Sequence, residues 1–114
     1  MQNKDHLTEV KARRAVRYQF GGLAEVVHLE SGWGLTGPAT VLSVCGCFVR
    51  TKTRFSPGSM IRLRITQGDV TVATSGYVVH NTDAGMGIAF NAIGPIEQST
   101  LEKLLVGATP CPTL

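Results

Sequence analysis

The chain has 114 residues, of which 43% are hydrophobic and 17% charged, a composition typical of one folded domain with its own core. Its formal net charge is +3, and no apolar run approaches the roughly 20 residues that a membrane-spanning helix requires. No apolar segment follows the polar start, Met1 to His6, so we expect no signal peptide, no membrane insertion and a cytoplasmic, bacterial setting.

The positive charge is concentrated in two parts of the sequence. The leader carries Lys4, Lys11, Arg13, Arg14 and Arg17. A central segment carries Arg50, Lys52, Arg54, Arg62 and Arg64. Such clustering favours an anionic partner.

Residues 1–18 are polar and basic without a regular period, so we expect a flexible N-terminal arm there. Short β-prone runs follow at residues 24–29, 36–44 and 47–51. The second of these runs is interrupted by Gly37-Pro38, a pair that usually breaks a strand.

Three further strands are expected in the second half of the chain. Residues 60–65 alternate cleanly, with aliphatic side chains on one face and arginines on the other, as in a half-buried antiparallel strand. Residues 70–80 predict a long strand bent at Gly76, and residues 86–90 predict the last strand after a hairpin loop.

A C-terminal helix is expected from Pro95, which suits the first helical turn, to about Gly107, which can end it. Leu101, Leu104 and Leu105 give it an apolar stripe. Residues 108–114 predict a tail without regular structure. The sequence thus predicts an all-β domain over residues 19–107, a six-stranded antiparallel β-barrel with a C-terminal amphipathic helix.

The three cysteines are an odd number in a chain without an export signal, which indicates free thiols. Cys45 and Cys47 lie in an apolar run with no second Cys or His pair at ligand spacing. We therefore expect no metal site and interpret both as small buried hydrophobic residues.

Two short patterns stand out when they are taken together. The first is Arg13-x-x-x-Arg17 in the basic leader, and the second is Ser43-Val-Cys-Gly46 between two expected strands. With the closing segments 76–80 and 85–90 they resemble the PilZ domain family. That family carries Arg-x-x-x-Arg, then Asp/Asn-x-Ser-x-x-Gly, on a six-stranded barrel with a C-terminal helix. The resemblance covers residues 11–106.

The resemblance implies a receptor for the bacterial second messenger cyclic di-GMP, with no other cofactor. Arginine can bind phosphate or the O6 and N7 edge of guanine with two hydrogen bonds. The resemblance implies ligand contacts from Arg13, Arg14 and Arg17 on the arm and from Ser43 and Gly46 on the barrel. The ring of His80 could stack on a guanine as a further base contact. The plainer interpretation of His80 is a partly exposed strand residue without a ligand role. Closure of the arm would alter contacts with a protein partner, in control of motility, biofilm or surface polysaccharide.

One position departs from the family pattern. Val41 stands where the motif has Asp or Asn, so a polar contact to the ligand base is missing there. Losing such a contact costs about 1–3 kcal/mol. A PilZ-like interaction adaptor that does not bind the nucleotide is therefore the alternative hypothesis.

Two other classes of function have weaker support. Single-stranded nucleic acid requires exposed aromatic side chains for stacking, whereas aromatic residues make up 6% here and Phe48 and Phe90 are expected to be buried. No nucleophile–base set or phosphate-binding loop matches a known catalytic motif, so we expect no enzyme.

Overall fold

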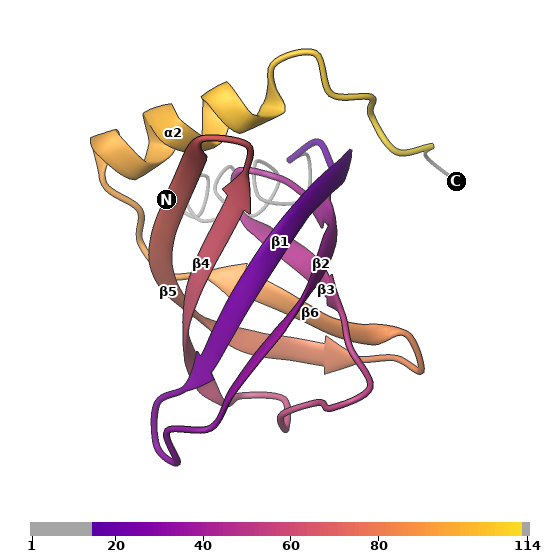
Figure 1. Ribbon diagram of the computed structural model, residues 1–114, viewed down its shortest axis with the longest axis vertical. Helices are drawn as coiled ribbons and strands as arrows, with labels where there is room; N and C mark the ends of the chain where they lie inside the picture. Colours follow the sequence, from indigo (N-terminus) through magenta and orange to yellow (C-terminus); the bar gives the residue numbers. More distant parts are fainter. Residues whose placement is uncertain (1–14, 113–114) are drawn as a thin grey trace, which may run out of the picture.

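Six antiparallel strands close into a barrel in the computed structural model, which describes residues 15–112 (Figure 1). The strand order around the barrel is β1-β2-β3-β6-β5-β4, and the closed six-stranded antiparallel barrel confirms the predicted fold. The strands are β1 (Tyr18–His28), β2 (Gly34–Leu42), β3 (Gly46–Arg50), β4 (Met60–Gln67), β5 (Val70–Asn81) and β6 (Gly85–Phe90).

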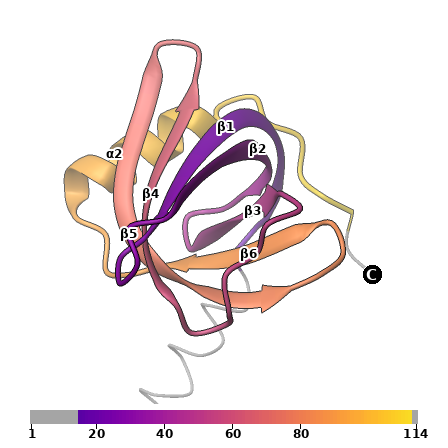
Figure 2. The same ribbon diagram turned by 60° about the horizontal axis from the view of Figure 1, so that its bottom comes forward.

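The core lies inside the barrel because alternate side chains of each strand point inward. The view in Figure 2 looks into the ring of strands that encloses it. In β4 the predicted alternation holds, with Ile61, Leu63 and Ile65 buried and the arginines between them exposed. The other strands contribute inward-facing residues that include Ala24, Val26, Ala39, Leu42, Val49, Val72, Val78, Met86 and Ile88.

Helix α2 (Pro95–Leu105) lies across one end of the barrel (Figure 1). Its Leu101 and Leu104 are buried in the core, while Leu105 is half-buried. Pro95 opens the helix, and Gly107, at φ 76°, follows its end, both as the sequence predicts. The apolar stripe of α2 therefore covers the open end that the strands leave.

The first two strands differ from their predicted bounds. β1 begins at Tyr18, six residues before the expected run, because its early part pairs with the end of β2 from Tyr18–Leu42 onward. β2 continues through Gly37 and Pro38 rather than breaking there. Its pairing with β3 begins at Ala39, so the proline lies just outside that ladder.

β5 is irregular between Val78 and His80, not at Gly76 as predicted. Gly76 itself pairs with Phe90, and a β-carbon there would collide with the carbonyl oxygen of Ala89. The glycine thus permits the close approach of β6 rather than a bend.

The tail is also more ordered than the sequence predicts, since Pro110 forms an isolated antiparallel bridge with Tyr18. The N–H of Gln19 donates to the carbonyl of Thr109 at 2.8 Å, and the N–H of Cys111 donates to the carbonyl of Arg17 at 2.8 Å. The tail therefore holds the chain where the basic leader enters β1. Among residues 15–112, no helix is long and apolar enough to cross a membrane.

We predict that Gly85→Ala destabilises the barrel by about 1–3 kcal/mol, because a β-carbon there would collide with the backbone of Val49 and Arg50. Urea unfolding of the purified domain measures this change. Gly21→Ala is the matched control, since its added β-carbon meets nothing within 4 Å. Equal midpoints for the two variants would contradict this account of the β3–β6 contact.

Candidate functional site

A tight turn of four residues joins β2 to β3 and is built by its first side chain. The hydroxyl of Ser43 accepts hydrogen bonds from the N–H groups of Cys45 at 3.0 Å and Gly46 at 3.2 Å. The N–H of Ser43 donates to the carbonyl of Gly46 at 2.9 Å. Ser43 is 7% exposed, so its hydroxyl is used mainly for hydrogen bonds within the turn. The predicted ligand contact of Ser43 would therefore act largely through the backbone shape that it fixes.

Gly46 is needed at the end of this turn because β6 passes very close to it. A β-carbon on Gly46 would collide with the carbonyl oxygen of Ile88. The N–H of Phe90 donates to the carbonyl of Cys45 at 2.9 Å, which ties the turn to the end of β6. The Ser43–Gly46 turn is thus a fixed corner of the barrel.

The strand register brings one of the predicted arginines to this corner. Tyr18 pairs with Leu42, so the adjoining residues Arg17 and Ser43 lie beside each other where the two strands end. The Arg17 side chain is exposed, while its carbonyl accepts the hydrogen bond from Cys111. Arg13 and Arg14 lie outside the described residues.

His80 lies on the outer face of the same side of the barrel. It pairs with Gly87 of β6, which in turn pairs with Phe48 of β3. The imidazole covers Gly87 so closely that a β-carbon there would lie 2.8 Å from its Nδ1. His80 is exposed, and Phe48 and Phe90 are half-buried rather than buried as predicted. An exposed ring therefore stands two strands away from the Ser43–Gly46 turn.

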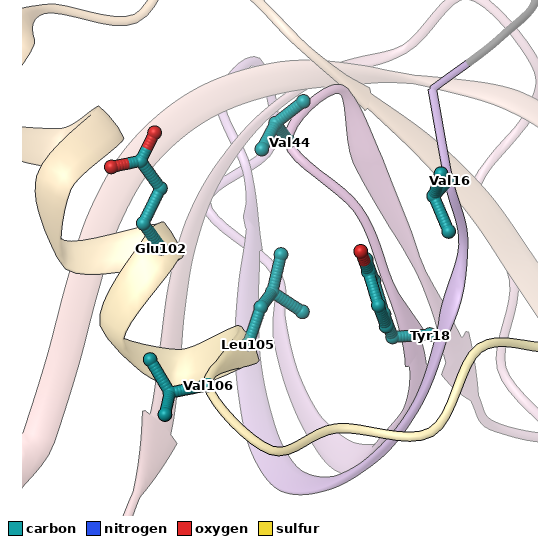
Figure 3. Close-up of a pocket in the computed structure, with 6 residues that line it drawn as sticks. All are labelled: Val16, Tyr18, Val44, Glu102, Leu105 and Val106. Atoms are coloured by element: carbon teal, nitrogen blue, oxygen red, sulfur yellow. The ribbon is translucent and has the colours of Figure 1, made fainter.

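An open pocket of about 400 Å³ lies between this corner and the end of α2 (Figure 3). The sequence did not predict it, because its lining comes from three distant parts of the chain. The lining residues are Val16, Tyr18, Val44, Glu102, Leu105 and Val106. Glu102 is the charged member of this lining, and its carboxylate would repel a phosphate. The pocket thus suits an apolar or aromatic group better than an anionic one.

The two cysteines of the C-x-C differ in exposure. Cys47 is buried as predicted, and burial raises the pKa of its thiol from the ordinary 9.0 to about 12. Cys45 is exposed, which corrects the prediction that both are buried. The difference arises because Cys47 lies within β3 and points inward, whereas Cys45 lies in the turn before that strand, where inward–outward alternation does not apply. Within residues 15–112 no group of three or more His, Cys, Asp or Glu side chains is placed to hold a metal ion.

We predict that Ser43→Ala lowers the free energy of unfolding by about 1–3 kcal/mol without any ligand present, because two turn N–H groups lose their acceptor. Thermal and urea unfolding of the ligand-free domain measure this loss. Ser99→Ala, an exposed change on α2, serves as the control. An unchanged stability for Ser43→Ala would show that its hydroxyl is not needed to hold the turn.

The barrel and its helix are shared with solved structures of low sequence identity. The PilZ domain of YcgR from Escherichia coli, solved with cyclic di-GMP, is 12% identical, with a TM-score of 0.71 over 83% of this chain and 89% of that one. The PilZ domain of CeSA from a cellulose-synthesizing bacterium is 14% identical, with a TM-score of 0.66 over 80% and 95%.

The Bacillus subtilis inhibitor of motility, MotI, is 18% identical, with a TM-score of 0.67, and this chain spans 50% of its length. No curated protein matches the chain by sequence. The sequence model of the PilZ domain matches residues 11–107, which include both short motifs and every strand. The chain therefore belongs to the PilZ domain family.

Proposed function

We propose that this domain is a receptor for cyclic di-GMP, a signalling module rather than an enzyme. The observation that carries the proposal is the register that brings Arg17 beside the Ser43–Gly46 turn. The two motifs lie far apart in the sequence, yet Arg17 of the first motif lies next to the second at one corner of the barrel. The E. coli YcgR domain, which has the same fold, was solved with this nucleotide.

The chemistry of the corner suits a guanine dinucleotide. A guanidinium can donate two parallel hydrogen bonds to phosphate or to O6 and N7 of guanine, and it can stack on a purine face. Arg17 is exposed and has a fixed backbone, so its side chain can reach the ligand without reordering β1. His80 offers a second flat surface for the other base. Arg13 and Arg14 complete the phosphate contacts from the arm.

The tail contacts divide the arm into a fixed part and a closing part. Because Arg17 and Gln19 are held by Cys111 and Thr109, arm closure would begin on the N-terminal side of Arg17. Arg13 and Arg14 are then the groups that move onto the bound nucleotide. Closure of the arm in this way would offer a new surface to a protein partner. Control of motility, biofilm or surface polysaccharide is the proposed output.

A second candidate is an interaction adaptor that does not bind the nucleotide. Val41 favours it, because this half-buried aliphatic side chain stands at the motif's polar position. Trp33 also favours it, since it is 70% exposed in the β1–β2 turn, at the end of the barrel away from α2 (Figure 1). The N–H of Trp33 donates to the hydroxyl of Ser31 at 3.1 Å, and the carbonyl of Trp33 accepts from the N–H of His28 at 2.7 Å, so the turn is fixed. Exposed tryptophan is enriched in protein interfaces.

We predict that Arg17→Ala weakens binding of cyclic di-GMP about ten- to a hundredfold, because hydrogen bonds to a charged group are lost. Calorimetry of the purified domain measures this, with GMP and cyclic di-AMP as ligand controls. Arg64→Ala is the matched variant, an exposed arginine in the middle of β4. Superimposable titrations of the native domain and Arg17→Ala would contradict the receptor proposal.

Val41→Asp separates the receptor from the adaptor. If the native domain is a receptor, it binds cyclic di-GMP already, and restoring the motif carboxylate raises the affinity by about ten- to a hundredfold. If it is an adaptor, the native domain gives no heat of binding while the variant binds. Calorimetry on both proteins decides between these results, with circular dichroism as the check on folding.

A further inference from the structure

A single row of paired residues crosses five strands on the outer face beside the proposed site. Gln19 of β1 pairs with Val41 of β2, and Val41 pairs with Phe48 of β3. Phe48 pairs with Gly87 of β6, and Gly87 pairs with His80 of β5. We call these five residues the outer row. Neighbouring strands lie about 4.8 Å apart, so adjacent members of the outer row are close enough to contact one ligand.

The outer row offers different chemistry along its length. At one end the exposed side chain of Gln19 carries a primary amide, with one acceptor and two donors. Next to it, Val41 and Phe48 are half-buried and form an apolar surface. Gly87 has no side chain, and the ring of His80 covers it from the far side. An amide beside an apolar surface is suited to a flat base that must be recognised by its edge.

Gln19 and Arg17 work on the same side of the barrel. Successive side chains alternate along a strand, and Phe20 of β1 is buried, so Gln19 points outward. Arg17 is exposed two positions earlier, about 7 Å along the chain. The Gln19 N–H donates to Thr109, which holds the backbone in place while the side chain remains free to point at a ligand.

The two side chains complement the two edges of guanine. Arginine reads O6 and N7, which are acceptors, while the 2-amino group and the neighbouring N1–H are donors. An amide oxygen can accept from these donors while the amide nitrogen donates to a neighbouring acceptor. Adenine lacks the 2-amino group, so the same amide would discriminate against it.

We propose that Gln19 is the residue that recognises the guanine base, an inference that depends on the proposed cyclic di-GMP function. The polar group absent at Val41 is supplied from the adjacent strand, directly across the β1–β2 ladder. Val41 and Phe48 then provide the apolar surface under the base, and Arg17 holds the phosphate or the other edge. Gln19 thereby sets the specificity for guanine over adenine.

Calorimetry with cyclic di-GMP and cyclic di-AMP tests this role on the full chain. Gln19→Leu is expected to weaken cyclic di-GMP binding about ten- to a hundredfold and to reduce the preference over cyclic di-AMP by a similar factor. Gln98→Leu is the matched control, since that amide lies on α2 and donates to Glu102. Its affinities should equal those of the native domain.

A rescue experiment separates recognition from a general loss of binding. Adding Val41→Asn to Gln19→Leu places an amide at the motif position, one strand away. We expect this double variant to recover most of the lost affinity and the preference for guanine. In the native domain, the side-chain amide signals of Gln19 in a nitrogen–proton spectrum should shift with cyclic di-GMP.

The outcomes distinguish the two proposals. If the native domain binds cyclic di-GMP and Gln19→Leu retains both affinity and guanine preference, Gln19 does not recognise the base and the receptor proposal stands. If Gln19→Leu loses affinity but adding Val41→Asn restores none of it, Gln19 does not replace the polar contact that the motif position would make. The inference is then overturned. If the native domain does not bind cyclic di-GMP, both proposals fail together.

Discussion

The close approach of β6 to its two neighbours is the constraint on which the rest of the barrel depends. A β-carbon on Gly46, Gly76 or Gly85 would collide with a backbone carbonyl of the adjacent strand. These positions therefore require glycine, which lets β6 pair closely with β3 and β5. On the outer face of the same strands, Gly87 lies between Phe48 of β3 and His80 of β5.

Much of the fold follows from local patterns in the sequence. The alternation of apolar and charged residues in 60–65 predicts a half-buried strand, and the leucine spacing in α2 predicts a helix that covers a core. The early start of β1 could not be read in this way. Its stretch around Gly21 and Gly22 has weak β-propensity, and long-range pairing with β2 makes it a strand.

The candidate site was only partly predictable for the same reason. The Arg-x-x-x-Arg and Ser-x-x-Gly patterns identify Arg17, Ser43 and Gly46, because each pattern lies within a few residues of sequence. Only the three-dimensional structure shows that the hydroxyl of Ser43 accepts hydrogen bonds from its own turn. The neighbour of Val41 could not be predicted from the sequence either, because Gln19 lies opposite Val41 only through the register of β1 and β2.

The C-terminal tail connects this site to the rest of the molecule. Backbone hydrogen bonds from Gln19 to Thr109 and from Cys111 to Arg17 hold both proposed base-contacting residues through the same short bridge. A ligand that binds better when Arg17 and Gln19 are held in place must stabilise the bridge by the same free energy, since such coupling is reciprocal. The bridge also lies close to the lining of the pocket at the end of α2, through Tyr18. By the same reciprocity, a protein that stabilises this bridge would strengthen binding of the proposed ligand by an equal free energy.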